Sequence, residues 1–261
     1  MKLGVALAGG AFKGICHLGA LEVLEKNGIK IDMVSGCSMG AVVGGLYAAG
    51  VPVEKLKEEL KDLKRGRLMD FYPKALRNMG LMSGDKIVRY LKGLCGDVLI
   101  EDLKTPFVAT AVDIVTGKTV YIDKGPLLDA IRASISIPGL FAAVKKDDML
   151  LVDGGVKERI PVSILKEKGM DKTLAINTST DPGVMRPKNM VMMLSRAFDL
   201  MDWESCRRGI GGCFCEADYT VPMERGCEIV YYKPSEAVKA YEMGVEAMTA
   251  HLERAKAALG L

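Results

Sequence analysis

Twice within its first 50 residues the chain passes from a short apolar run, through a glycine-framed turn, into a helical pattern. The first unit has an apolar run over 3–8, glycines at positions 9, 10 and 14, and a helix predicted over 15–27. The second has a run over 32–36, the turn Gly-Cys-Ser-Met-Gly at 36–40, and a helix predicted from Met39 to Ala49. A buried strand that feeds a helix in this way is the unit of an α/β protein with a parallel sheet.

The same alternation continues along the rest of the chain. Strands are predicted over 107–114, 118–122, 148–152, 173–178, near 218–222 and near 228–232. Helices are predicted over about 53–64, 84–94 and 188–205, just before the strand 173–178, and at the C-terminus. This order predicts a largely parallel central sheet with helices on both faces, a three-layer sandwich. No linker or internal repeat divides the chain, so we expect residues 1–261 to form a single domain. In the helix over 188–205, Val191, Leu194, Phe198 and Met201 fill one helical face, and Met190, Met192, Met193 and Met201 are predicted to belong to the core and not to contact a ligand.

Two motifs carry the chemistry of a nucleophile and its base. Ser38 lies at the centre of a G-x-S-x-G turn between a strand and a helix, which is typical of a nucleophile elbow. A serine is a weak nucleophile unless a base accepts its proton. Asp153 follows the strand over 148–152 and precedes Gly154 and Gly155, which allow a close approach of another backbone. It is the best-placed base.

The glycine loop at the end of the first strand leaves backbone N–H groups that can point at an anion. In an acyl hydrolase such groups stabilise the oxyanion of the tetrahedral intermediate. A nucleotide-binding turn fits less well. The dinucleotide fingerprint needs a glycine where this chain has Ala11 and an acidic residue at the end of the second strand, whereas Asp32 stands at its start. Lys13 is not followed by Ser or Thr, which excludes a Walker loop.

Together these motifs resemble the patatin-like phospholipases, which have a glycine-rich oxyanion loop, a G-x-S-x-G serine and a D-G-G or D-G-A aspartate in that order. The similarity covers roughly residues 1–180. It includes the stretches 109–113, 116–118, 132–134 and 137–139. The resemblance implies a patatin-like fold and hydrolysis of lipid acyl esters by a Ser38–Asp153 dyad without a histidine.

By motif position, the resemblance also assigns the glycines around this dyad. Gly10 and Ala11 would supply the oxyanion N–H groups, and Gly9 and Gly14 would shape the loop. Gly36 and Gly40 would frame the elbow, as Gly154 and Gly155 would frame the aspartate.

The chain departs from the family pattern at two places. The family usually has a third glycine where this chain has Ala11. Alanine keeps the backbone N–H donor, but we expect its methyl group either to crowd the acyl group or to restrict the loop. After the aspartate motif the family often has Asn-Pro, where this chain has Glu158 and Arg159.

Two histidines are present, and neither is the expected base. The order Ser38, Asp153, His251 is that of a Ser-Asp-His triad, so a triad stays open on chain order. His251, however, lies at the polar edge of the apolar stripe of the last helix, where we expect it to be solvated. His17 lies on the apolar stripe of the first helix, and we expect a hydrogen-bonded packing residue that supports the loop.

Composition limits the partners. The net charge of +3 is too small to indicate nucleic-acid binding and is compatible with peripheral contact with a membrane. Seven scattered cysteines without a C-x-x-C pair predict a reduced, cytoplasmic chain. No apolar stretch reaches the 18 residues of a membrane span, and no cluster has metal-ligand spacing, so no metal or other cofactor is expected. The oligomeric state is left open.

Residues 65–82 mix aromatic, methionine and basic residues without a clear period, so they fit either a mobile cover over the site or a surface helix pair. The function predicted from all these features is a serine acyl hydrolase that cleaves phospholipids or related lipid esters. Two alternatives remain: a small-ester esterase or lysophospholipase, and a regulatory protein of low turnover that retains the fold.

Overall fold

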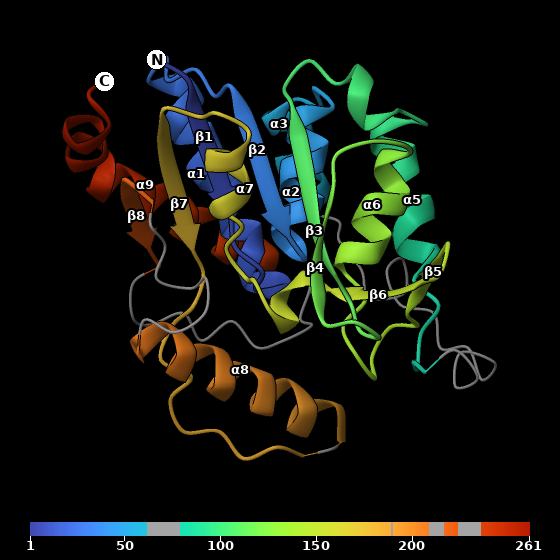
Figure 1. Cartoon of the computed structure of the whole chain (residues 1–261). Helices are drawn as coiled ribbons and strands as arrows, with labels where there is room; N and C mark the ends of the chain where they lie inside the picture. The colour runs from blue at the N-terminus through green and yellow to red at the C-terminus, as the bar shows by residue number, and fades with distance from the viewer. Residues whose placement is uncertain (62–78, 189, 209–216, 224–235) are drawn as a thin grey trace.

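An eight-stranded sheet organises the molecule in the computed structural model, which describes residues 1–61, 79–188, 190–208, 217–223 and 236–261 (Figure 1). Its strands are β1 (Leu3–Leu7), β2 (Met33–Cys37), β3 (Phe107–Asp113), β4 (Lys118–Ile122), β5 (Val144–Lys146), β6 (Met149–Asp153), β7 (Lys172–Asn177) and β8 (Tyr219–Pro222). They lie in the order β5-β6-β3-β2-β1-β7-β8, and β4 pairs with β3 as well. The five strands from β3 to β8 in this order are parallel, and β4, β5 and β6 extend the sheet in antiparallel pairing. The largely parallel sheet predicted from the sequence is confirmed.

Helices cover both faces of this sheet (Figure 1). One face carries α1 (Cys16–Lys26), α2 (Met39–Ala48), α3 (Val53–Lys61), α5 (Asp85–Cys95), α6 (Leu127–Ser134) and α9 (Ala237–Leu259), whose buried residues share the main hydrophobic core. The other face carries the short helix α7 (Ser163–Glu167), which packs with Ile160 and Val162 on Ala6, Val108 and Ala175. The three layers are therefore unequal, because a single short helix and its loop form the thinner one in the described part of the chain.

Helix α8 (Met190–Arg208) stands apart from both layers (Figure 1). It lies beyond the carboxyl ends of the parallel strands, where parallel α/β sheets bind their ligands. None of its described side chains is buried. Met190, Met193, Leu194, Phe198, Leu200 and Met201 are all exposed. The prediction that this helix contributes to the core is wrong for the predicted core residues among these and for Met192, which is half-buried, because the helix lies beyond the ends of the strands and not against a face of the sheet (Figure 1).

Most elements lie where the sequence predicts them, with ends that differ by a few residues. Two were not predicted: β5, which is only three residues long, and α6, which begins directly after Pro126. The predicted strand near 228–232 and residues 65–78 of the predicted cover lie outside the described residues. Of the remainder of that segment, Met82 is buried and pairs with Phe141. No helix in the described ranges combines the length and the apolar character that a membrane span needs.

Candidate active site

Ser38 occupies a strained turn between β2 and α2. Its φ of 53° and ψ of −121° lie where non-glycine residues are rare, and such strain is typical of a nucleophile elbow. The turn is tight because α2 passes close to β1: a Cβ at position 40 would lie 2.2 Å from the carbonyl oxygen of Leu7. Only glycine therefore fits at position 40. Only glycine fits at position 36 for the same reason, since a Cβ there would lie 2.4 Å from the carbonyl oxygen of Gly40.

Ser134, the last residue of α6, fixes the backbone of the elbow by a hydrogen bond. The backbone N–H of Ser38 donates to Oγ of Ser134 at 2.9 Å, and that hydroxyl donates in turn to the carbonyl oxygen of Thr110 on β3 at 2.7 Å. Ser134 is fully buried, so no water competes for these bonds. The position of the Ser38 backbone is thus fixed by the central strand as well as by its own turn.

The sheet brings Asp153 to Ser38 through strand β3. β4 occupies one edge of β3, so β2 and β6 share the other edge. β2 ends with Cys37 paired to Thr110, and β6 ends with Asp153 paired to the next residue, Ala111. The two strands run toward each other and stop at adjacent residues of β3. This register places the predicted nucleophile and the predicted base side by side, although more than a hundred residues separate them in the chain.

The carboxyl group of Asp153 is buried and held in a fixed position. Oδ1 accepts hydrogen bonds from the N–H of Gly155 at 2.8 Å and from Sγ of Cys37 at 3.6 Å. Burial raises the pKa of Asp153 above its ordinary value, against the opposing effects of the Ser38 hydroxyl, these two donors and the charge of Arg159. Oδ2 makes no well-formed hydrogen bond among the described residues, so it can accept a proton. A raised pKa suits a carboxylate to act as a base near neutral pH.

The loop between β1 and the 3₁₀ helix Ala11–Ile15 lies next to this pair. The N–H of Gly9 donates to the carbonyl oxygen of Arg159 at 2.9 Å, and Oγ1 of Thr178 donates to the carbonyl oxygen of Gly9. By contrast, the N–H groups of Gly10 and Ala11 donate to no acceptor in the described ranges. An oxyanion loop needs this arrangement, in which hydrogen bonds hold Gly9 in place while the N–H groups of Gly10 and Ala11 stay available to the oxyanion.

Ala11 adopts the left-handed conformation, with φ of 46°. That conformation favours glycine, which explains why a third glycine is usual at this position in proteins with this loop. The Gly14 position is tight for a different reason, since a Cβ there would lie 2.6 Å from Cβ of Met39. The loop therefore packs directly on the first turn of α2, beside Ser38.

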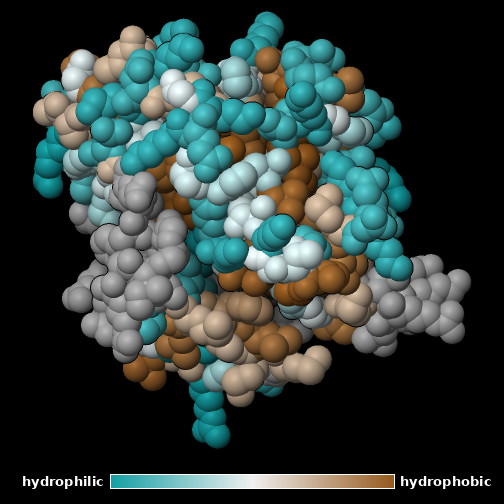
Figure 2. All heavy atoms as spheres, in the orientation of Figure 1, coloured by the Kyte–Doolittle hydropathy of each residue, from teal (hydrophilic) through white to brown (hydrophobic). Residues whose placement is uncertain are grey.

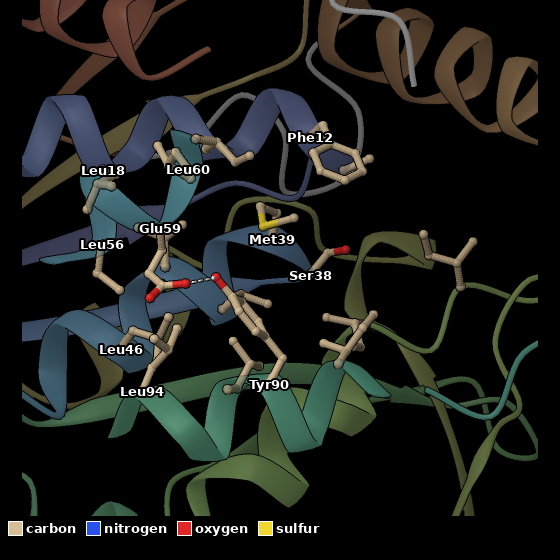
Figure 3. Close-up of a pocket in the computed structure, with 18 of the residues that line it drawn as sticks. Phe12, Leu18, Ser38, Met39, Leu46, Leu56, Glu59, Leu60, Tyr90 and Leu94 are labelled. Atoms are coloured by element: carbon tan, nitrogen blue, oxygen red, sulfur yellow. Dashed lines mark hydrogen bonds between the residues drawn. The ribbon is translucent and has the colours of Figure 1, made fainter. Parts of the chain in front are cut away.

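An apolar groove leads away from Ser38 (Figure 3). Its floor is α2, its walls are α3 and α5, and its end near Ser38 is formed by the loop 11–15 and residues 135–141. The lining residues are Ala11, Phe12, Ile15, Leu18, Ser38, Met39, Val42, Val43, Leu46, Leu56, Glu59, Leu60, Ile87, Tyr90, Leu91, Leu94, Ile135, Ile137 and Phe141. A lining of this kind accepts a hydrocarbon chain rather than a charged ligand.

The two histidines take different places. Nε2 of His17 lies 2.7 Å from the carbonyl oxygen of Ala8, and burial lowers the pKa of this histidine to about 4, so it is neutral and donates. It supports the end of β1 from which the loop starts, as expected. Nδ1 of His251 pairs with the hydroxyl of Tyr219 at 2.8 Å. β8 lies three strands from β2, or roughly 14 Å, so the structure does not bring His251 to Ser38.

The structure thus brings Ser38, Asp153 and the loop 9–14 together, with Gly36 and Gly40 at the elbow and Gly154 and Gly155 after the aspartate. A Cβ at position 154 would lie 2.5 Å from the carbonyl oxygen of Thr110, so that glycine lets the aspartate turn pack on β3. Sequence reasoning missed the supporting residues Ser134, Thr178 and Arg159. Arg159 was noted only as a departure from a pattern, and Ser134 only as part of the matching stretch 132–134, without a role. Nothing local in the sequence marks Thr178.

Arg159 also connects the site to α8. Its guanidinium Nη1 lies 2.9 Å from Oδ2 of Asp202 on α8, and Oγ of Ser179 donates to the same oxygen at 2.8 Å. Asp202 is therefore held by two groups that belong to the catalytic end of the sheet.

Comparisons with known proteins give the family of the chain. The family model "Patatin-like phospholipase" matches residues 5–166. An uncharacterized NTE family protein of Mycobacterium bovis is 35% identical over 176 residues, which are 67% of this chain and 49% of that protein. The lysophospholipase nte1 of Emericella nidulans is 31% identical over 182 residues, which are 68% of this chain and 12% of that protein. This chain thus spans about half the length of the mycobacterial relative and far less of the fungal one.

Two solved structures share the fold. VipD from Legionella pneumophila aligns with a TM-score of 0.54 and 15% identity over 96% of this chain and 67% of that one. The human GIVD cytosolic phospholipase A2, in complex with methyl gamma-linolenyl fluorophosphonate, aligns with a TM-score of 0.54 and 10% identity over 99% of this chain and 58% of that one. At such identities the likeness concerns the fold alone.

Proposed function

Because the chain belongs to the patatin-like phospholipase family, we propose that it is a serine acyl hydrolase that cleaves phospholipids or related lipid acyl esters with a Ser38–Asp153 dyad. The observation that carries this proposal is the register on β3, where the strands that deliver Ser38 and Asp153 end at adjacent residues. The fungal relative, which is named a lysophospholipase and so acts on a lipid ester, also supports the proposal.

The reaction follows the usual two steps of acyl transfer to water. Oγ of Ser38 attacks the ester carbonyl carbon, and Asp153 accepts the hydroxyl proton. The N–H groups of Gly10 and Ala11 stabilise the oxyanion, and the N-terminal end of α2 favours the same negative charge. The alcohol leaves with the proton from Asp153. Water then attacks the acyl-serine and gives a proton to Asp153, which passes that proton to Oγ of Ser38 as the bond to the acyl group breaks and the fatty acid departs.

The apolar groove favours a substrate with at least one acyl chain. It begins at Ser38 and continues between α2, α3 and α5, so an ester whose carbonyl lies at Ser38 can bury its chain there. This supports a lipid ester over a small ester. One groove for one chain also fits a lysophospholipid, so the lysophospholipase alternative remains the second candidate. A low-turnover regulatory role is less well supported, because Asp153 is poised as a base.

We further propose peripheral contact between α8 and a membrane surface. Met190, Met193 and Met201 on α8 are exposed, and Figure 2 shows apolar side chains gathered at this end of the molecule. Arg186 and Lys188, which precede α8, are exposed and can attract anionic lipid. A lipid surface suits this helix because the proposed substrate resides there. A cytoplasmic enzyme that acts at the membrane, with residues 1–261 as one hydrolase domain, is the corresponding proposal for location and domain organisation.

Fluorophosphonate labelling followed by intact-mass analysis tests the dyad. We expect wild type to gain one label, Ser38→Ala to gain none, Asp153→Asn to react at least about 10²-fold more slowly, and His251→Ala to match wild type. Loss of labelling in His251→Ala would replace the dyad with a triad. A wild type that neither reacts nor hydrolyses p-nitrophenyl esters would favour the regulatory alternative.

The pH dependence adds a second readout. Because burial raises the pKa of Asp153, kcat/KM should fall as the pH drops through a value above that of an ordinary carboxyl group.

A further inference from the structure

The groove is apolar except for Ser38 at one end and one pair of polar side chains in its interior. Among the described residues that line it, polar side-chain groups belong only to Ser38, Glu59 and Tyr90. The Tyr90 hydroxyl donates to Oε2 of Glu59 at 2.9 Å. Figure 3 shows this bond in the interior of the groove, with Ser38 on one side and Leu46 and Leu94 on the other.

The bond joins the two walls of the groove. Glu59 belongs to α3 and Tyr90 to α5, and one helical turn away Nζ of Lys55 donates to the carbonyl oxygen of Leu94 at 3.3 Å. The pairs 59–90 and 55–94 show that α3 and α5 run antiparallel at this point. The Glu59–Tyr90 bond therefore spans the groove like a strap, and the Leu46–Leu94 region lies beyond it.

We propose that the Glu59–Tyr90 bond sets the length of the acyl chain that this enzyme accepts, an inference that rests on the proposed function. A chain whose carbonyl carbon lies at Ser38 extends along α2 toward the strap. Each methylene buried before the strap improves binding by up to about fourfold. A longer chain brings methylenes against the carboxylate of Glu59 and removes its water, which is unfavourable for a charged group. The benefit of added length therefore ends at the strap.

The test is a series of p-nitrophenyl esters from acetate to palmitate. In wild type, kcat/KM should rise with chain length, pass through a maximum and fall before palmitate. In the double variant Glu59→Leu/Tyr90→Phe, which removes both polar groups together, the maximum should move to longer chains. The ratio of palmitate to butyrate hydrolysis should increase at least about tenfold, which corresponds to a gain of two methylenes.

Two further variants make the result specific. Glu58→Leu introduces the same change at the neighbouring exposed position of α3, outside the groove lining, and should leave the chain-length profile unchanged. Tyr90→Phe removes only the hydroxyl and preserves the ring, so it tests the bond with little risk to folding. A double-variant profile that superimposes on wild type would overturn the inference.

Binding separates this inference from the proposed function. The affinity of Ser38→Ala for a series of free fatty acids, measured by isothermal titration calorimetry, should show the same length limit and the same extension in Ser38→Ala/Glu59→Leu/Tyr90→Phe. If no ester is hydrolysed but the binding limit moves, the proposed function fails and the strap stands. If esters are hydrolysed with Ser38 dependence but neither limit moves, the strap fails and the proposed function stands.

Discussion

The catalytic edge, which comprises Ser38, Asp153 and the loop 9–14, and helix α8 lie at the same end of the sheet but are built in opposite ways. At the catalytic edge the side chains are buried: Ser38 is 7% exposed and Asp153 is 5% exposed. On α8, Met193 is 58% exposed and Met201 is 66% exposed. The first region is enclosed by protein, and the second presents its apolar side chains to the surroundings.

The two regions also differ in how they are attached. Ser134 fixes the elbow to β3, while Gly155 and Cys37 fix the carboxylate of Asp153. One connection between helix α8 and the catalytic edge runs through Asp202, which meets Arg159 and Ser179. This difference implies that substitutions at the catalytic edge should lower both the unfolding free energy and the activity on every substrate, because they leave buried groups without hydrogen-bond partners. Substitutions on α8 should affect the interaction with lipid surfaces.

The largest contrast is expected from one pair of serine-to-alanine variants. Ser134→Ala leaves the buried N–H of Ser38 without its acceptor, which should cost about 1–3 kcal/mol of unfolding free energy. The displaced elbow should lower kcat/KM about 10²-fold on all esters. Ser179→Ala removes one of the bonds to Asp202, while Arg159 still pairs with that carboxylate, so it should cost about 1 kcal/mol or less.

Urea unfolding and ester kinetics on both variants measure these effects. Equal losses in the two variants would remove the distinction between the buried catalytic edge and the exposed helix.

The contrast also explains which parts of the molecule could be predicted from the sequence. The catalytic edge needs close approaches between backbones, and close approaches demand particular residues. Gly40 is an example, since any side chain would strike Leu7. Such requirements leave a local signature, so Ser38, Asp153 and the loop were predicted to act together, and the structure brings them together. Their chemical roles stay predictions until variants are assayed.

The supporting residues and α8 leave no such signature. Ser134 acts on an N–H that is 96 positions away in the chain, and a serine at the end of a short helix looks the same with or without that partner. The apolar face of α8 was predicted to be core because helical periodicity reports that one face is apolar, and it does not report what covers that face. Periodicity alone could not distinguish a buried helix from one exposed beyond the ends of the strands.

A second prediction concerns the stability of the fold at acid pH and depends on His17, which supports the chain just before the loop of the catalytic edge. Burial lowers the pKa of His17 to about 4 from its ordinary 6.5, so the unfolded chain binds a proton that the folded chain refuses. The contribution of this histidine to the unfolding free energy is fully present above about pH 6.5 and is lost as the pH drops toward 4. Between about pH 7.5 and pH 5 this single group should remove about 2 kcal/mol of unfolding free energy.

Urea titrations at both pH values measure this loss, with His17→Gln as the comparison. Glutamine keeps a donor for the carbonyl oxygen of Ala8 and cannot be protonated in this range. The variant should therefore lose less stability on acidification than wild type. An identical loss in both proteins would show that His17 is not the source of the acid sensitivity.

A third prediction tests the outward face of α8. Met193→Asp and Met201→Asp should lower the ratio of activity on anionic phospholipid vesicles to activity on a dispersed butyrate ester about tenfold, through lost burial of apolar area and added charge repulsion. Leu99→Asp is the matched control, since Leu99 is exposed and precedes β3 at the opposite end of the sheet. Vesicle flotation reports binding directly. An unchanged activity ratio together with unchanged flotation would show that α8 does not contact the lipid surface.

The smallest effect is expected at Ala11, where the conformation of the catalytic edge and the identity of the residue disagree. Its φ of 46° is unfavourable for alanine by roughly 1 kcal/mol, and glycine would relieve that strain. Glycine also increases the freedom of the unfolded chain, which costs about the same amount. Ala11→Gly should therefore change the unfolding free energy by less than about 0.5 kcal/mol. Ala250→Gly, at an exposed position in the middle of α9, has no strain to relieve and should cost about 1 kcal/mol. If the two variants lose equal stability, the left-handed conformation at Ala11 carries no strain, and its departure from glycine has no energetic consequence for the oxyanion loop.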